Sequence, residues 1–313
     1  MLSTRITQML GIQYPVIQGA MAWIATGALA GAVSEAGGLG IIGAGTADAQ
    51  WLKREIDVVR RITDKPFGVN LVLVSPHVDD NVELLLRERV PVVTTGAGSP
   101  GKYIPRFKEC GTKVIPVVAS VALAKRLVRL GADAVIAEGM ESGGHVGEMT
   151  TMCLVPMVVD AVEVPVIAAG GIADGRGLAA ALALGAEGVQ MGTRFICAEE
   201  CPAHPLYKER VLKAGDRDTE VCGVVTGHPV RAIRNKFVRH YLACERSGMP
   251  AEELERLGAG KYPAAALGGD VENGSVLAGQ VVGLVDRIQP AAEIVAEVVR
   301  DAQRVLRRLG GLA

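Results

Sequence analysis

This 313-residue chain has few aromatic residues and almost no net charge. Phe, Trp and Tyr together make up 4% of it, so it offers no series of rings on which single-stranded nucleic acid could stack. Lys plus Arg number 33 and Asp plus Glu number 34, which gives a formal net charge of −1. A chain so close to neutral has no general attraction for nucleic acid or for an anionic membrane, and we expect neither as a partner.

Long apolar segments and paired cysteines are also lacking. No charged residue occurs between Arg5 and Glu35, but a proline and four glycines interrupt that segment, which argues against a signal peptide or a membrane span. The six cysteines form no CxxC pair, and Cys197 and Cys201 with His204 do not follow a standard zinc spacing. We therefore expect no metal site and a cytoplasmic protein with reduced thiols.

What the chain does contain is a series of short apolar runs, spaced by roughly two dozen residues, the length of one strand, one helix and two loops. The predicted strands are Pro15–Gln18, Leu39–Ile42, Phe67–Leu71, Pro91–Thr95, Lys113–Val117, Asp133–Ala137, Pro165–Ala168 and Gly188–Met191. Helical patterns lie between them at Thr26–Ala36, Ala49–Thr63, Asp79–Arg89, Ser120–Leu130 and Gly175–Leu184. Eight such units predict an α/β fold of the (β/α)₈ or TIM-barrel type, with a doubly wound sheet as the alternative; the count of eight favours the barrel.

Small and polar residues follow the predicted strands. In a barrel the carboxyl ends of all strands meet at one rim, where the active site lies. The segments that reach this rim are Gly19–Ala22, Gly43–Gly45, Asn70, Thr94–Gly96, Glu138–His145, Ala169–Ile172 and Gly192–Thr193. Their composition predicts a flat ligand lying against backbone.

Two adjacent loops of this rim carry a phosphate-site pattern. Gly170-Gly171, followed by Asp174–Gly177, comes after the seventh strand, and Gly192-Thr193 comes after the eighth. Phosphate groups in barrels often bind between these two loops against backbone N–H groups. Ordinary strand-to-helix turns remain the alternative, and the paired glycines favour phosphate.

A second glycine pattern is misleading. Gly38–Gly43 spells GxGxxG, the dinucleotide-binding fingerprint. That fingerprint has to follow a strand and open a helix, whereas here the apolar residues inside the motif form the strand. We do not interpret it as a dinucleotide site.

The loop Glu138–Thr150 is the strongest candidate for the chemistry. It holds several glycines and carboxylates together with His145, one of only five histidines. An imidazole held there can exchange a proton near neutral pH. The alternative is a mobile surface loop in which the histidine has no function.

Taken together, these segments resemble a known group of flavin-dependent barrels, the nitronate monooxygenases with the FMN-dependent enoyl-[acyl-carrier-protein] reductases II. The shared motifs are Gln18–Trp23, Ser34–Ile42, Phe67–Asn70, Gly143–His145, Ala169–Ala173 and Gln190–Phe195. The reductase branch is the more similar in Ala137–Gly147, in Asp218–Val221 with Thr226–Asn235, and in Gly269–Ser275 with Gly279–Leu284.

The resemblance implies that FMN and a reduced nicotinamide, NADH or NADPH, saturate the double bond of a trans-2-enoyl thioester on acyl carrier protein in fatty-acid synthesis. Nitronate oxidation with FMN and O₂ is the alternative, and a non-catalytic flavin or phosphate-ligand carrier is the third. His145 would be catalytic. The residues expected at the cofactor are Gly19, Ala20, Met21, Ala22, Gly45, Asn70, Thr94, Glu138, Ser142, Gly143, Gly144, Gly170, Gly171, Gln190, Met191, Gly192 and Thr193. Met21, Ala22 and Asn70 would flank the ring, while Gly171, Gly192 and Thr193 would take the phosphate.

After the eighth strand the chain changes character. We predict an FMN-binding barrel over 1–215, a small lid or substrate domain over 216–275, and C-terminal helices over 276–313 that pack back on the barrel. Arg231, Arg234, Lys236 and Arg239 are basic at near-helical spacing, which indicates either a solvated helix face or a patch for the phosphates of the nicotinamide cofactor or of the acyl carrier's pantetheine arm. His228 is interpreted as structural. The resemblance adds a homodimer and a monovalent cation held by carbonyl groups around Cys222–Thr226.

Overall fold

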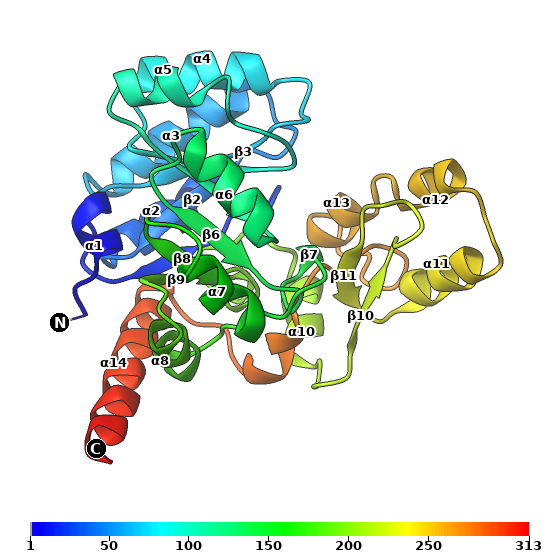
Figure 1. Cartoon of the computed structure of the whole chain (residues 1–313). Coiled ribbons are helices and arrows are strands. Elements are labelled where there is room, and N and C mark those ends of the chain that lie inside the picture. Colours follow the sequence, from blue (N-terminus) through cyan, green and yellow to red (C-terminus); the bar gives the residue numbers. More distant parts are fainter. Residues whose placement is uncertain (1, 313) are drawn as a thin grey trace.

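The computed structural model describes residues 2–312 and contains a closed barrel of eight parallel strands, each followed by helical chain (Figure 1). The barrel strands, in spatial order, are β1 (Val16–Gln18), β2 (Leu39–Gly43), β3 (Gly68–Val72), β4 (Val92–Gly96), β5 (Lys113–Val118), β6 (Val135–Glu138), β8 (Val166–Ala169) and β9 (Gly188–Met191). The predicted TIM barrel is confirmed, and all eight predicted strands coincide with these. Since Leu39–Gly43 is itself strand β2, the GxGxxG segment does not open a helix.

Helices cover the outside of the barrel. They are α2 (Gly27–Glu35), α3 (Ala49–Ile62), α4 (Val78–Glu88), α5 (Ile104–Glu109), α6 (Val121–Arg129), α7 (Thr151–Val159), α8 (Gly175–Ala183) and α14 (Ala291–Gly310). Local signals define several starts: the side chains of Asp48, Ser120 and Asp174 accept hydrogen bonds from N–H groups in the first turns of α3, α6 and α8. Helix α14 packs on α8 and α2 and so closes the outer layer.

Two layers of apolar side chains define the core. Ile17, Ile41, Ile115, Ile136 and Ile167 belong to the cluster inside the barrel, while alternate residues such as Val135 and Val189 face the helices. Helix α1 (Arg5–Leu10) adds Ile6 and Leu10 to the inner cluster and closes the amino end of the barrel. The opposite end, where the strands finish, is left for a site.

The chain beyond β9 forms a smaller unit on the other side of the barrel from α1 (Figure 1). After α9 (Thr193–Ile196) and α10 (Pro205–Leu212) come β10 (Thr219–Cys222), β11 (Val230–Ile233), α11 (Lys236–Arg246), α12 (Ala251–Gly258) and α13 (Lys261–Ala266). A 3₁₀ helix, η1 (Gln280–Leu284), leads back to α14. A short strand within the chain that follows β6, β7 (Gly144–His145), joins β10 and β11 in a three-stranded sheet.

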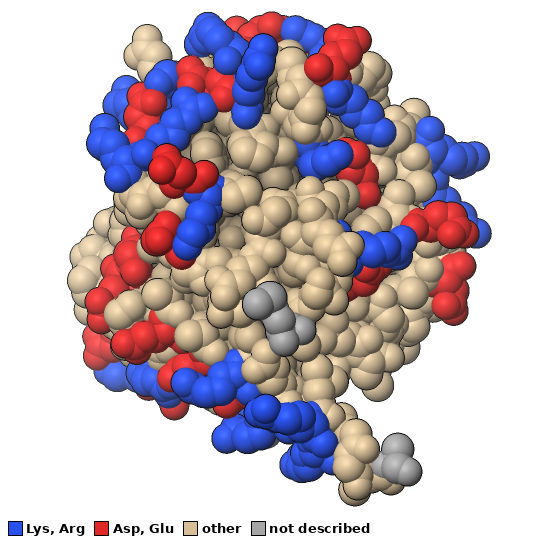
Figure 2. Space-filling model, turned by 90° about the vertical axis from the view of Figure 1, so that its left-hand side faces the viewer, with Lys and Arg blue, Asp and Glu red and all other residues tan. Residues whose placement is uncertain are grey.

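Charged side chains are mixed on the face shown in Figure 2, where Lys and Arg lie among Asp and Glu around a broad uncharged area. The basic cluster near the bottom of that view belongs to the end of α14, where Arg300, Arg304, Arg307 and Arg308 are exposed. No helix within residues 2–312 combines the length and the apolar character that crossing a membrane requires.

Candidate functional site

The carboxyl ends of the barrel strands present a polar layer to the interior. Side chains alternate along a strand, and because Val92 and Ile136 face the barrel interior, so do Thr94 and Glu138 two residues later. Asn70 and Gln190 take equivalent positions on β3 and β9, and Asn70 Nδ2 donates to Thr94 Oγ1 at 3.0 Å. Strand register places Glu138 beside Ala169, and Ala169 beside Gln190. Four predicted residues therefore line one mouth.

The other predicted residues surround this layer. Gly19, Ala20, Met21 and Ala22 follow β1; Gly45 follows β2; Ser142 and Gly143 precede β7, which contains Gly144 and His145; Gly170 and Gly171 follow β8; Gly192 and Thr193 follow β9. Met191 is the exception, because its side chain packs in the outer core. Its carbonyl oxygen accepts a hydrogen bond from Gly19 N at 2.8 Å.

Two of the predicted glycines have a packing reason to be glycine. A Cβ on Gly143 would lie 2.5 Å from the Ala278 carbonyl carbon, and one on Gly170 would lie 2.7 Å from the Gly139 oxygen. Gly192 differs, since a Cβ there would have only Met21 Sδ near it, at 3.9 Å. The absence of a side chain at Gly192 thus leaves open space beside the backbone.

Unpartnered polar groups gather at the two loops predicted to hold phosphate. Within residues 2–312 we find no protein acceptor for the N–H groups of Gly171, Gly192 or Thr193. Thr193 Oγ1 accepts a hydrogen bond from Gly279 N at 2.9 Å, so its own proton can still be donated. Ser142 Oγ is buried without a hydrogen-bond partner. Ser142 and Thr193 are buried, and buried hydroxyl groups need hydrogen-bond partners, of which a phosphate group would supply several.

His145 is held by a segment far away in sequence. Strand β7 pairs antiparallel with β11, so that His145 lies opposite Val230, and Val146 N donates to the Pro229 oxygen at 3.1 Å. Gly144–His145 is therefore a paired strand and not an irregular loop. The hairpin also brings His228 to His145, with ring centroids 6.4 Å apart and ring planes at 88°.

Arg231 binds a backbone carbonyl group in the segment between β6 and β7. It is 4% exposed, and its Nε and Nη2 donate to the Met140 oxygen at 3.1 and 3.0 Å. Its Nη1 donates to Thr219 Oγ1 at 3.2 Å. Arg231 lies on β11 and Arg234 just after it, so the interpretation of these two as part of a basic helix face is wrong; Lys236 and Arg239 do lie on α11.

Glu141 and Thr151 form a second anchor that the sequence analysis missed. The Glu141 carboxylate accepts from Thr151 N at 2.9 Å and from Thr151 Oγ1 at 2.9 Å. The Glu141 carbonyl accepts from Gln280 N at 2.9 Å. Glu141 lies in the loop Glu138–Thr150 singled out around His145 and Thr151 directly follows it, but nothing in their spacing indicates the contact.

Of the cysteine and histidine group after β9, the two cysteines belong to the core. Burial raises the pKa of Cys197 and of Cys201 to about 11, so both are neutral thiols. His204 Nδ1 accepts from Leu206 N at 3.2 Å at the start of α10. Among residues 2–312 no group of three or more metal-ligating side chains is arranged to hold an ion.

Replacing His228 by glutamine is expected to raise the pKa of His145. Desolvation by the surrounding chain lowers that pKa, and repulsion from His228 lowers it further. Glutamine removes the repulsion, so the imidazolium form of His145 persists to higher pH. Titration of the His145 ring by NMR in both proteins measures this, and an unchanged midpoint would contradict an electrostatic contact between the rings.

The profile of nitronate monooxygenases matches residues 3–83 and 74–301 of the chain. The chain belongs to the nitronate monooxygenase family. Among solved structures, FabK from Thermotoga maritima is similar to this chain: the two are 52% identical over 100% of both chains, with a TM-score of 0.97. A nitroalkane oxidase from Streptomyces ansochromogenes is 30% identical over 97% of this chain and 99% of that one, with a TM-score of 0.88.

A curated relative from Rhodococcus jostii RHA1 is 36% identical over 99% of both chains. It is named (3aS,4S,5R,7aS)-5-hydroxy-7a-methyl-1-oxo-octahydro-1H-indene-4-carboxyl-CoA dehydrogenase. Relatives from different branches of the family are thus oxidoreductases, and so is this protein.

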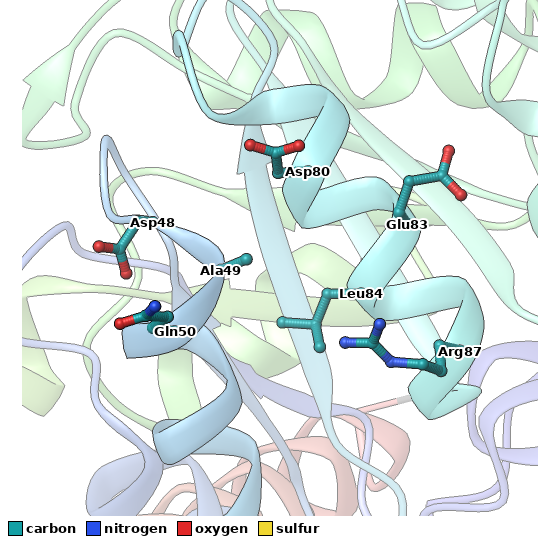
Figure 3. Close-up of a pocket in the computed structure, with 7 residues that line it drawn as sticks. All are labelled: Asp48, Ala49, Gln50, Asp80, Glu83, Leu84 and Arg87. Atoms are coloured by element: carbon teal, nitrogen blue, oxygen red, sulfur yellow. The ribbon is translucent and has the colours of Figure 1, made fainter.

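A separate hollow of about 470 Å³ lies outside the barrel, between the start of α3 and helix α4 (Figure 3). It is lined by Asp48, Ala49, Gln50, Asp80, Glu83, Leu84 and Arg87. None of the residues predicted for this family's site is among them, so the polar mouth of the barrel remains the candidate active site.

Proposed function

We propose that the protein uses FMN and NADH or NADPH to reduce trans-2-enoyl thioesters on acyl carrier protein to saturated thioesters in fatty-acid elongation. The observation that carries the proposal is the 52% identity to FabK over the full length of both chains, together with the motifs by which the chain resembles the FMN-dependent enoyl-[acyl-carrier-protein] reductases II. The carboxyl-CoA substrate in the name of the Rhodococcus relative is also a thioester.

The residues at the mouth fit FMN. The free N–H groups of Gly171, Gly192 and Thr193, with the Thr193 hydroxyl and Ser142 Oγ, would hold its phosphate. The backbone of Met21 and Ala22 would flank the ring together with Asn70. Bound FMN would supply the hydride chemistry between nicotinamide and substrate, so the protein needs few reactive side chains.

His145 is suited to stabilising charge on the substrate. Its lowered pKa makes the uncharged imidazole the main form at neutral pH. A neutral ring still has one N–H, which can donate to the thioester oxygen as negative charge develops there. The segment 216–275, which reaches His145 through β11, would cover the substrate as a lid.

Nitronate oxidation with FMN and O₂ is the second candidate, favoured by the family match and by the Streptomyces nitroalkane oxidase. The neutral form of His145 could act there as a base. A cation at the carbonyl groups of Cys222–Thr226, a homodimer and a cytoplasmic location complete the proposal.

The two reactions are separated by anaerobic flavin reduction. We expect NADH or NADPH to bleach the visible absorption of the FMN-loaded protein, and an enoyl thioester to restore it. His145→Ala should slow the restoring step by about 10²-fold and leave bleaching unchanged. A flavin that neither nicotinamide reduces, together with turnover of a nitronate in air, would replace the reductase by the alternative.

A further inference from the structure

Glu138 is the single acidic side chain in the polar layer of the mouth. It ends β6 and is half-buried. Its neighbours in the layer, Asn70, Thr94 and Gln190, are all uncharged. Among residues 2–312 we find no hydrogen-bond or ion-pair partner for its carboxyl group, although such partners are the rule for enclosed carboxylates.

The surroundings of Glu138 favour its protonated form. Ala169 lies opposite it on β8, and β5 contributes no ionisable side chain at the level of the mouth. In the chain that follows, Glu141 is occupied by Thr151, and the basic groups placed there are His145 and Arg231, which donates to the Met140 oxygen. Desolvation raises the pKa of Glu138 to about 7, with no charged neighbour contributing.

Glu138 and His145 are therefore shifted in opposite directions. The acid keeps its proton to higher pH, whereas the imidazole loses its proton at lower pH. Two titratable groups whose proton affinities are pushed apart in one site commonly divide the acid and base roles between them. At neutral pH the carboxylic acid is the better source of a proton in this mouth.

We propose that Glu138, not His145, donates the proton to the α-carbon of the enoyl thioester. This inference rests on the proposed reductase function. Arrival of a hydride at the β-carbon moves the π electron pair of the C=C bond onto the α-carbon and thioester oxygen. The O–H bond of Glu138 then breaks as the new C–H bond forms at the α-carbon. Glu138 is left as a carboxylate and takes a proton from solvent before the next turnover.

Glu138→Gln tests the proposal, because it keeps the shape and removes the proton. Flavin reduction by NAD(P)H is expected to stay within about twofold, whereas reoxidation by an enoyl thioester falls by about 10²-fold. Glu148→Gln is the matched control, since Glu148 is an exposed carboxylate in the same segment, and it should leave both half-reactions unchanged.

A readout independent of turnover is the infrared band of a protonated carboxylic acid. It should titrate near pH 7 in the wild-type protein, shift in Glu138→Asp and be absent in Glu138→Gln. A wild-type protein without that band overturns the proposal even if the glutamine variant does not fold.

The remaining outcomes are equally decisive. If enoyl thioesters reoxidise the flavin of Glu138→Gln as fast as that of the wild-type protein, Glu138 is not the proton donor, but the reductase function stands. A glutamine variant that no longer binds FMN assigns Glu138 to cofactor binding instead. A wild-type protein that is never reoxidised by enoyl thioesters overturns the reductase function itself.

Discussion

Arg231→Ala is expected to lower enoyl-thioester turnover by about 10²-fold while the protein still binds FMN. The guanidinium holds the Met140 oxygen with two N–H groups and lies opposite Gly144 in the β7–β11 pair. Without it the Met140 carbonyl loses its partner and the strand that carries His145 is free to shift. A displacement of about 1 Å of a catalytic group can cost 10²-fold in rate. Steady-state kinetics with an enoyl thioester measures the loss.

Arg234→Ala is the control for Arg231→Ala. It removes the same charge from the same hairpin, but Arg234 is exposed and forms an ion pair with Glu220, at 2.8 Å, so turnover should change less than about twofold. Arg231→Lys separates charge from geometry, because an ammonium group cannot present two parallel N–H donors; it should remain slow. Arg231→Ala should also lower the free energy of unfolding by about 2 kcal/mol. An Arg231→Ala protein with more than half of the wild-type turnover would rule out this role.

The barrel could be predicted from the sequence because its signals are local. Each inner strand, such as Val135–Glu138, is a short apolar run, and each long helix has a clear pattern. Two of the helices that connect successive barrel strands were not predicted. Helix α5 has only six residues, and α7 (Thr151–Val159) is apolar on nearly all sides and contains Pro156, so neither shows the one-sided periodicity of a surface helix.

Strand β7 could not be predicted because its partner is distant. Gly144–His145 is too short to form a strand alone, and it becomes one through β11, which lies more than 80 residues further along the chain. The same separation hides the bond between Arg231 and Met140. The near-helical spacing of Arg231, Arg234, Lys236 and Arg239 indicates a helix face when only the sequence is considered. Pairing of β11 with β7 places Arg231 in a strand instead, so tertiary contacts override the local pattern.

Composition predicted where the site lies but not what each glycine does there. The segments that follow the strands meet at one mouth, as any barrel requires. Gly143 and Gly170 are small because other backbone crosses close to them, whereas the position of Gly192 is open. A glycine required by packing and a glycine required by a ligand have the same appearance in a sequence, and only the neighbouring atoms distinguish them.

Gly192→Val should therefore abolish tight FMN binding without unfolding the protein. Gly192 has φ −107°, which any residue adopts, and its Cβ position is free apart from Met21 Sδ at 3.9 Å. A branched side chain there would occupy the space beside the free N–H groups of Gly192 and Thr193 and block the phosphate. Losing one or two hydrogen bonds to a charged group, each worth about 1.5–3 kcal/mol, corresponds to roughly a 10³-fold weaker Kd. Titration of the apoprotein with FMN, followed by flavin fluorescence, measures this.

Gly215→Val is the matched control for Gly192→Val, since a Cβ on Gly215 would meet only Asp218 Oδ2, at 3.8 Å. The two variants make the same chemical change in equally open space, but Gly215 lies between α10 and β10 and not in a loop that directly follows a barrel strand. Both should keep the wild-type Tm as apoproteins, and only Gly192→Val should lose FMN; Gly192→Ala should fall between. Equal FMN affinity in the two valine variants would place the phosphate elsewhere, because a ligand held by the Gly192 and Thr193 amides cannot tolerate a side chain in the space that Gly192 leaves open.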